Sequence, residues 1–129
     1  MDQGNIKSCR ILVVEDNHIN QKVIKGLLVI FGYEPDVVEN GKQAVEKVAE
    51  GAYDIVFMDC QMPEMDGYEA TMLIRESETD NHTVIIAMTG NSMAGDREKC
   101  LACGMDDYVS KPLRIEELKS TLEKWIPTQ

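Results

Sequence analysis

The stretch ILVVEDNHINQKVIKGLLVIFG, residues Ile11–Gly32, contains the pattern of a strand followed by a helix. It starts with four consecutive aliphatic residues, a length and composition typical of a buried strand. After the acidic pair, Asn17 can cap a helix and Gly32 can end it. Apolar residues between these two positions recur at steps of three or four: Ile19, Val23, Leu27 and Ile30. The stretch therefore predicts a strand and an amphipathic helix that packs on a sheet.

The same alternation continues along the rest of the chain. Five short apolar runs have the character of strands: Ile11–Val14, Pro35–Val38, Asp54–Met58, Val84–Met88 and Tyr108–Ser110. An amphipathic stretch follows each run, and strict alternation with short connections predicts a parallel sheet with helices on both faces. Continuous apolar character makes the first, third and fourth runs central, whereas Pro35 suits an edge strand. We therefore predict a doubly wound α/β fold, a flavodoxin-like (βα)5 arrangement with strand order 2-1-3-4-5.

Length and composition indicate one domain and exclude several functions. The 129 residues, 43% of them hydrophobic, suit a single buried core, and we expect residues 1–8 to form a short polar leader and residues 9–127 that domain. A formal net charge of -10 would repel a phosphate backbone, which disfavours nucleic-acid binding by this domain. No apolar run approaches the roughly 20 residues of a membrane span, and the start MDQGNIKS lacks a signal-peptide pattern. We therefore expect a cytoplasmic domain without membrane insertion, whose cysteines stay reduced.

Polar side chains stand where four of the predicted strands end. Glu15 and Asp16 follow the first strand, Asp59 the third, Thr89 the fourth and Lys111 the fifth. In an open α/β sheet, ligands bind in the crevice outside the carboxyl ends of the strands. The sequence therefore predicts that these five side chains converge on one site.

Three carboxylates in one crevice require a compensating positive charge. Two carboxylates about 5 Å apart repel by roughly 3 kcal/mol at an effective dielectric constant near 20. A hard divalent cation with oxygen ligands, Mg²⁺ in particular, suits such a site. Alternatively, Glu15 and Asp16 merely begin a helix, where acidic side chains favour the positive end of the helix dipole. The presence of Asp59, Thr89 and Lys111 at the other strand ends favours a site.

Four motifs carry these residues in a fixed order: ILVVEDN (Ile11–Asn17), IVFMDCQMPEMDGYEAT (Ile55–Thr71), IIAMTGN (Ile85–Asn91) and GMDDYVSKPL (Gly104–Leu113). In order and spacing they resemble the receiver domain of response regulators in two-component signalling. The resemblance covers the chain from Cys9 to Trp125 and is closest to receivers attached to hybrid sensor histidine kinases.

The resemblance implies a specific chemistry for the acidic residues. Asp59 would accept a phosphoryl group from a phosphohistidine by nucleophilic attack of its carboxylate. Asp16 would bind Mg²⁺ directly, Glu15 through water, and the backbone carbonyl of Gln61 would be a further ligand beside Asp59. The bound metal would neutralise charge on the phosphoryl oxygens during transfer.

The resemblance also assigns roles to residues on later strands and loops. Lys111 would pair with a phosphoryl oxygen, and Thr89 would hydrogen-bond another. Thr89 and Tyr108 would report phosphorylation through a shift between two packings. Gln61 and Asn91, two residues after Asp59 and Thr89, would flank the approach of water and tune dephosphorylation.

Together these roles describe a signalling switch with intrinsic self-phosphorylation and autodephosphorylation, and not a metabolic enzyme. Its partner would be a histidine kinase or a histidine phosphotransfer protein, and its location cytoplasmic, including the case of a membrane-bound hybrid kinase. Two alternatives stay open. A pseudo-receiver would keep the fold as a binding module without phosphorylation. A haloacid-dehalogenase-like phosphatase would also use an aspartyl phosphate, but that family has a second acid where this chain has Gln61.

Two smaller expectations concern cysteine and glycine. We expect Cys60 to be a small buried residue, and the C-x-x-C at Cys100 and Cys103 to be structural, because no second cysteine pair or nearby histidine completes a metal site. We expect Gly67, in the loop QMPEMDG, to supply a φ angle that other residues avoid.

Overall fold

The computed structural model describes residues 9–51, 53–60, 65–78, 82–90, 96–111 and 113–126. The expected leader, residues 1–8, lies outside these ranges. Within them the strands are β1 (Ile11–Val14), β2 (Asp36–Val38), β3 (Ile55–Asp59), β4 (Val84–Thr89) and β5 (Asp107–Ser110). The helices are α1 (His18–Ile30), α2 (Gly41–Glu50), α3 (Gly67–Ser77), α4 (Asp96–Ala102) and α5 (Ile115–Trp125).

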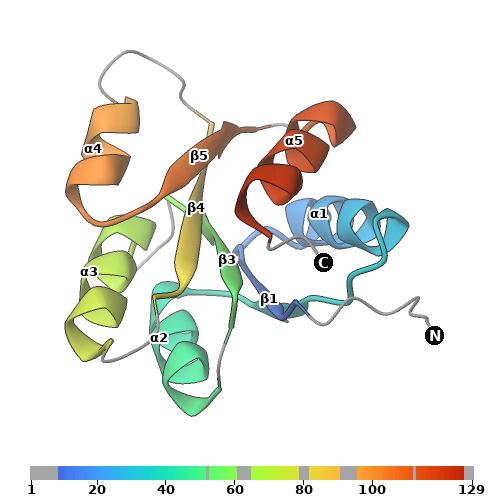
Figure 1. Cartoon of the computed structure of the whole chain (residues 1–129). Helices are drawn as coiled ribbons and strands as arrows, with labels where there is room; N and C mark the ends of the chain where they lie inside the picture. The colour runs from blue at the N-terminus through green and yellow to red at the C-terminus, as the bar shows by residue number, and fades with distance from the viewer. Residues whose placement is uncertain are drawn as a thin grey trace.

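The strands form one parallel sheet in the order β2-β1-β3-β4-β5, which confirms the predicted topology (Figure 1). Pro35 lies just before the edge strand β2, while the residues of the central strands β1 and β3 are all buried. This burial on both faces explains why the central strands read as continuous apolar runs.

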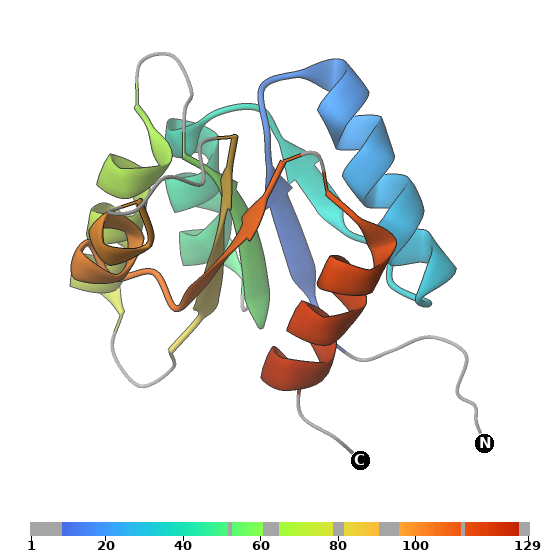
Figure 2. The ribbon, with the colours of Figure 1, turned by 90° about the horizontal axis from the view of Figure 1, so that it is seen from above.

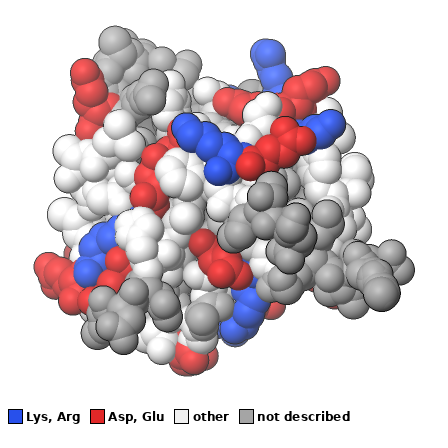
Figure 3. Space-filling model, in the orientation of Figure 1, with Lys and Arg blue, Asp and Glu red and all other residues white. Residues whose placement is uncertain are grey.

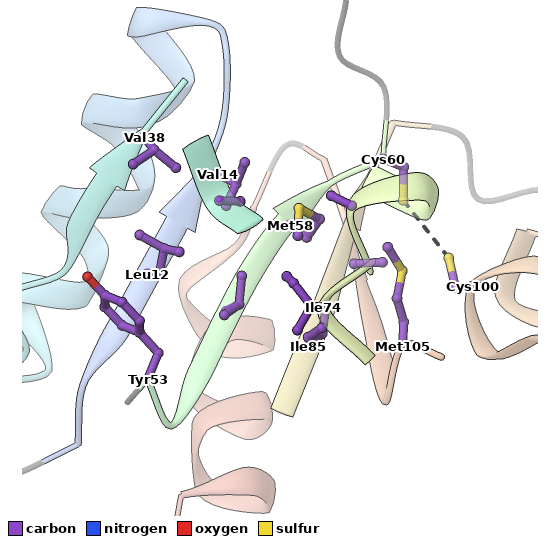
Figure 4. Close-up of a cluster of buried hydrophobic side chains, with 14 residues drawn as sticks. Leu12, Val14, Val38, Tyr53, Met58, Cys60, Ile74, Ile85, Cys100 and Met105 are labelled. Atoms are coloured by element: carbon purple, nitrogen blue, oxygen red, sulfur yellow. Dashed lines mark hydrogen bonds between the residues drawn. The ribbon is translucent and has the colours of Figure 1, made fainter. Parts of the chain in front are cut away.

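Helices cover both faces of the sheet, as the view from above shows (Figure 2). Successive residues of a strand point to opposite faces, so β1 contributes Leu12 and Val14 to one core layer and Ile11 and Val13 to the other. The first layer packs against α2, α3 and α4 and is drawn in Figure 4. The second packs against α1 and α5. The sheet is thereby packed between two apolar layers, with its carboxyl edge at their margin.

The end of β3 lies one residue later than predicted. The predicted strand ends at Met58, but Asp59 still pairs with Met88 of β4, and the amide of Cys60 donates to the carbonyl of Met88 at 3.0 Å. At the other end, Asp54 precedes the strand and its carboxylate accepts from the backbone amide of Arg10 at 2.8 Å. The backbone of Asp59 therefore belongs to a paired strand rather than to a loop.

Helix α1 begins and ends as the sequence predicts. The side chain of Asn17 accepts from the backbone amide of Asn20 at 3.0 Å and caps the helix. Gly32 follows the helix with a φ of 93°, in the left-handed region that favours glycine. The helix thus starts two residues after the acidic pair that follows β1.

Gly67 is needed for a different reason from the one expected. Among the described glycines, a positive φ occurs at Gly32 and Gly104, so the expectation for Gly67 is wrong. A Cβ atom on Gly67 would instead overlap the carbonyl oxygen of Asp59 and lie 2.9 Å from Cγ of Met58. The absence of a side chain therefore lets α3 start directly against the end of β3.

The surface carries charges of both signs. On the face drawn in Figure 3, acidic and basic side chains are interspersed and form no broad basic area. None of the helices that the structure describes is long and apolar enough to cross a membrane.

Candidate functional site

The three acidic residues predicted from the strand ends meet at the carboxyl edge of the sheet. One carboxylate oxygen from each of Glu15, Asp16 and Asp59 lies within 4.8 Å of the others. Glu15 and Asp59 are buried, with 1% and 3% of their surface exposed, whereas Asp16 is exposed. The ends of two adjacent strands, β1 and β3, thus bring a pair of buried carboxylates beside a solvent-accessible one.

Lys111 supplies the positive charge between the two buried acids. Its Nζ lies 2.9 Å from Oε1 of Glu15 and 3.0 Å from Oδ1 of Asp59. The Lys111 backbone amide donates to the carbonyl of Thr89 at 2.8 Å, which continues the β4–β5 pairing into the site. Burial by itself lowers the pKa of Lys111, but hydrogen bonds and charges from Glu15 and Asp59 outweigh it and raise that pKa. The ammonium therefore stays protonated.

The charges of the site fit a divalent cation. The three carboxylates and the Lys111 ammonium give the site a formal net charge of -2. The donor atoms are carboxylate oxygens, the ligands that Mg²⁺ prefers, and exposed Asp16 gives access from solvent. The residues present therefore suit the predicted metal in charge, ligand type and accessibility.

Thr89 and Tyr108 lie on the two neighbouring strands β4 and β5. Thr89 ends β4, is buried and stands opposite Ser110, while Tyr108 stands opposite Ala87. Tyr108 is half-buried and packs against the core layer that includes Cys100 of α4. Thr89 and Tyr108 thus lie on paired strands two register positions apart, Thr89 at the carboxyl edge of the sheet and Tyr108 beside the layer beneath α4.

Sequence reasoning missed the contacts at the start of α1 that hold Glu15. The side-chain amide of Gln21 donates to the backbone carbonyl of Glu15 at 2.6 Å. The backbone amide of Asn17 donates to Oε2 of Glu15 at 3.2 Å, and Nδ2 of Asn20 lies 3.5 Å from the same oxygen. The signal was present as the two amide side chains of Asn20 and Gln21, since Asn17 contributes only its backbone amide. Such side chains are common at helix starts for capping alone.

Two predicted site residues, Gln61 and Asn91, lie outside the described residues. Cys60, next to Asp59, is buried as predicted, and its Sγ faces that of Cys100 at 4.0 Å (Figure 4). Burial raises the pKa of the Cys60 thiol to about 12, so the thiol is protonated at neutral pH. Cys60 is therefore part of the core and not a nucleophile.

Comparison with known proteins places these residues in a family. A family model described as the response regulator receiver domain matches residues 11–123. Hybrid signal transduction histidine kinase B of Dictyostelium discoideum is 48% identical over 120 residues, which cover 84% of this chain and 6% of that protein. The next curated relatives are matched over 16% and 7% of their lengths, so the chain spans only a small part of the relatives it resembles.

Solved structures show the same likeness. The receiver domain of sensor histidine kinase PA1611 from Pseudomonas aeruginosa, which has a magnesium ion in its active site cleft, is 44% identical with a TM-score of 0.86. That match covers 95% of this chain and 100% of that one. A chain of the Saccharomyces cerevisiae co-crystal of the histidine phosphotransfer protein Ypd1 with the Ssk1 receiver domain is 29% identical, with a TM-score of 0.84, and the match covers 93% of this chain and 90% of that one. With its fold, its acidic site and a family match over residues 11–123, this chain belongs to the response regulator receiver domains.

Proposed function

We propose that this domain accepts a phosphoryl group on Asp59, in the presence of Mg²⁺, from a phosphohistidine on a histidine kinase or a histidine phosphotransfer protein. The observation that carries the proposal is the contact of Lys111 with both buried acids, 2.9 Å from Glu15 and 3.0 Å from Asp59. A strand-end carboxylate beside a fixed ammonium combines a nucleophile with a cation for the incoming phosphoryl oxygens. We place the domain in the cytoplasm, on its own or within a hybrid kinase like its relatives.

The proposed transfer is a displacement at phosphorus. A carboxylate oxygen of Asp59 forms a bond to phosphorus while the nitrogen–phosphorus bond of the donor breaks and its electron pair returns to the imidazole. Asp59 acts as an ionised carboxylate, so the attack needs no general base. Lys111 pairs with one phosphoryl oxygen, and the hydroxyl of Thr89 donates to another.

Mg²⁺, when bound, neutralises charge on the nucleophile and on the phosphoryl oxygens. Asp16 and Asp59 would hold the metal directly, Glu15 through water, and Gln61 through its backbone carbonyl. The support is the grouping of the three carboxylates within 4.8 Å and the magnesium ion in the related PA1611 receiver.

The proposed output passes through Thr89 and Tyr108. Thr89 moves toward the phosphoryl group, and the ring of Tyr108 fills the space beside it, which shifts the population between two packings. Tyr108 already packs against the layer under α4, so its movement would change the surface of α4 and β5.

Intact mass after treatment with acetyl phosphate and Mg²⁺ separates this function from its alternatives. A receiver gains a single, Mg²⁺-dependent phosphate that decays slowly through its own autodephosphorylation. A pseudo-receiver gains none. A phosphatase of the haloacid-dehalogenase type turns over a phosphomonoester such as p-nitrophenyl phosphate many times, whereas a receiver does not.

Asp16→Ala tests the metal site. Loss of a direct carboxylate ligand should weaken Mg²⁺ binding by about a hundredfold or more, because two unit charges about 4 Å apart attract by about 4 kcal/mol at an effective dielectric constant near 20. The metal-free fold should be as stable as wild type or more stable, because repulsion among the three acids is relieved. The midpoint of thermal unfolding, followed against Mg²⁺ concentration, measures both effects. An unchanged Mg²⁺ affinity would exclude Asp16 as a ligand.

Gln61→Leu and Asn91→Leu test the lifetime of the aspartyl phosphate. Both amides follow two residues after a site residue and can orient water without acting as strong bases. We expect slower phosphate loss in each variant with little effect on folding, because a backbone carbonyl ligand at position 61 survives substitution. Phosphate decay at saturating Mg²⁺ is the measurement, and wild-type rates in both variants would remove these side chains from the mechanism.

A further inference from the structure

We infer that Gln21 is a positioning residue for the metal site, because its side chain holds the peptide bond that joins Glu15 to Asp16. This inference rests on the proposed function and concerns the same site. The Gln21 side-chain amide donates to the carbonyl oxygen of Glu15 at 2.6 Å, a short contact for a neutral donor. The backbone of Gln21 is itself fixed, since its amide donates to the carbonyl of Asn17 at 2.9 Å in the first turn of α1.

Because the peptide bond is planar, this hydrogen bond also restrains the backbone of Asp16. The carbonyl of Glu15 and the amide of Asp16 lie in one rigid plane, so a hydrogen bond on the oxygen also orients the start of Asp16. On its other side, Glu15 is held by the sheet, where its backbone amide donates to the carbonyl of Val38 at 3.1 Å. The backbone of Glu15 is thus held on both sides of its α-carbon, the amide by Val38 of β2 and the carbonyl by Gln21.

Asp16 depends on this support more than the other acids do. The carboxylate of Glu15 is held by Lys111 at 2.9 Å and by the backbone amide of Asn17 at 3.2 Å, and Asp59 contacts Lys111 at 3.0 Å. Within the part of the chain that the structure describes, the side chain of exposed Asp16 has no hydrogen bond or ion pair. The structure therefore places the carboxylate of Asp16 only through the Cα–Cβ bond at the start of its side chain, and Gln21 holds the peptide that precedes this bond.

Removal of an outer contact of this kind commonly weakens metal binding 10- to 100-fold while the ligands themselves remain. We therefore expect Gln21→Leu to weaken Mg²⁺ binding about tenfold, because the peptide between the acids can then turn and the carboxylate of Asp16 must be ordered when the metal binds. If Gln21 only stabilises the start of α1, Gln21→Leu should instead lower the stability of the fold and leave the Mg²⁺ affinity unchanged.

The control is Thr121→Val. The hydroxyl of Thr121 also donates to a backbone carbonyl, that of Glu117 at 2.9 Å. This bond joins two residues of α5, and neither belongs to the acidic site. Valine keeps the shape of threonine, so the substitution removes one side-chain hydrogen bond to a carbonyl, as Gln21→Leu does. Gln21→Ala repeats the test without the bulk of leucine.

The experiment follows the thermal unfolding midpoint of the whole chain against Mg²⁺ concentration, and the rate of phosphorylation by acetyl phosphate over the same range. In Gln21→Leu and Gln21→Ala, the half-saturating Mg²⁺ concentration should rise about tenfold, while the phosphorylation rate at saturating Mg²⁺ stays near that of wild type. Thr121→Val should keep the wild-type Mg²⁺ dependence in both measurements.

Wild-type Mg²⁺ affinity in both Gln21 variants, or the same loss in Thr121→Val, would overturn the inference. If Asp16→Ala weakens Mg²⁺ binding in the same assay while the Gln21 variants do not, only the role of Gln21 fails. If the wild-type chain shows neither stabilisation by Mg²⁺ nor Mg²⁺-dependent phosphorylation, the proposed function fails and the positioning role fails with it.

Discussion

Asp59→Asn should abolish phosphorylation by acetyl phosphate, because a carboxamide has no anionic oxygen to attack phosphorus. Asn has nearly the same shape as Asp, and the backbone of Asp59 is held by pairing with Met88 of β4. The substitution also leaves Lys111 paired with Glu15 at 2.9 Å. We therefore expect the fold to survive, with a free energy of unfolding within about 1 kcal/mol of wild type, the range of a modest change in polar contacts.

The control is Asp54→Asn, which changes a carboxylate just before the opposite end of the same strand. Asp54 is exposed and accepts a hydrogen bond from the amide of Arg10, far along β3 from the acidic site. This variant should gain one phosphate as the wild type does. Intact mass after incubation with acetyl phosphate and Mg²⁺ decides the outcome. If Asp59→Asn gains phosphate at the wild-type level, another residue is the phosphoacceptor.

The fold could be predicted because the residue pattern of each strand shows whether one or both of its faces are buried. In β1, Leu12 and Val14 face one core layer and Ile11 and Val13 the other, so a central strand needs an unbroken apolar run. Pro35 predicted that β2 lies at an edge of the sheet, because proline has no amide hydrogen to donate to a neighbouring strand. The end of β3 could not be placed to the residue, since Asp59 is polar and belongs to the strand only through its pairing with Met88 of β4.

The meeting of the acids at one edge could also be predicted, because the carboxyl ends of parallel strands necessarily converge there. The contacts that depend on how helices pack could not. The hydrogen bond from Gln21 to the carbonyl of Glu15 requires the position of α1 over β1, and the contact of Gly67 with Asp59 requires the position of α3 against β3. Neither distance follows from spacing along the chain, so sequence reasoning assigned Gly67 a positive φ that it does not have.

Gly67→Ala should therefore damage both the fold and the site. Gly67 is the first residue of α3, and its amide donates to the carbonyl of Cys60 at 3.3 Å, so the helix start is held close to β3. An added methyl group would collide with the carbonyl oxygen of Asp59, a backbone atom that cannot rotate away. Because β3 is paired on both sides, by β1 and β4, α3 must shift or the Asp59 peptide must turn.

Overpacking of this kind costs about 1–3 kcal/mol, and we expect the free energy of unfolding to fall by about 2–3 kcal/mol because the contact is with backbone. Phosphorylation should slow by about tenfold or more, since a displacement of Asp59 moves the nucleophile away from Lys111. Denaturation in urea measures the free energy of unfolding, and intact mass against time measures the phosphorylation rate.

Gly26→Ala is the matched control for this prediction. Gly26 lies exposed in the middle of α1, and a Cβ atom there would meet nothing within 4 Å. The same change should stabilise the chain by up to about 1 kcal/mol, because alanine loses less backbone freedom in a helix than glycine. The two substitutions thus add the same methyl group, but Gly67→Ala should lower the free energy of unfolding and Gly26→Ala should raise it. Equal stability of the two variants, or unchanged phosphorylation in Gly67→Ala, would show that α3 can move away from β3 without disturbing Asp59, and the close approach at Gly67 would then have no part in holding the site.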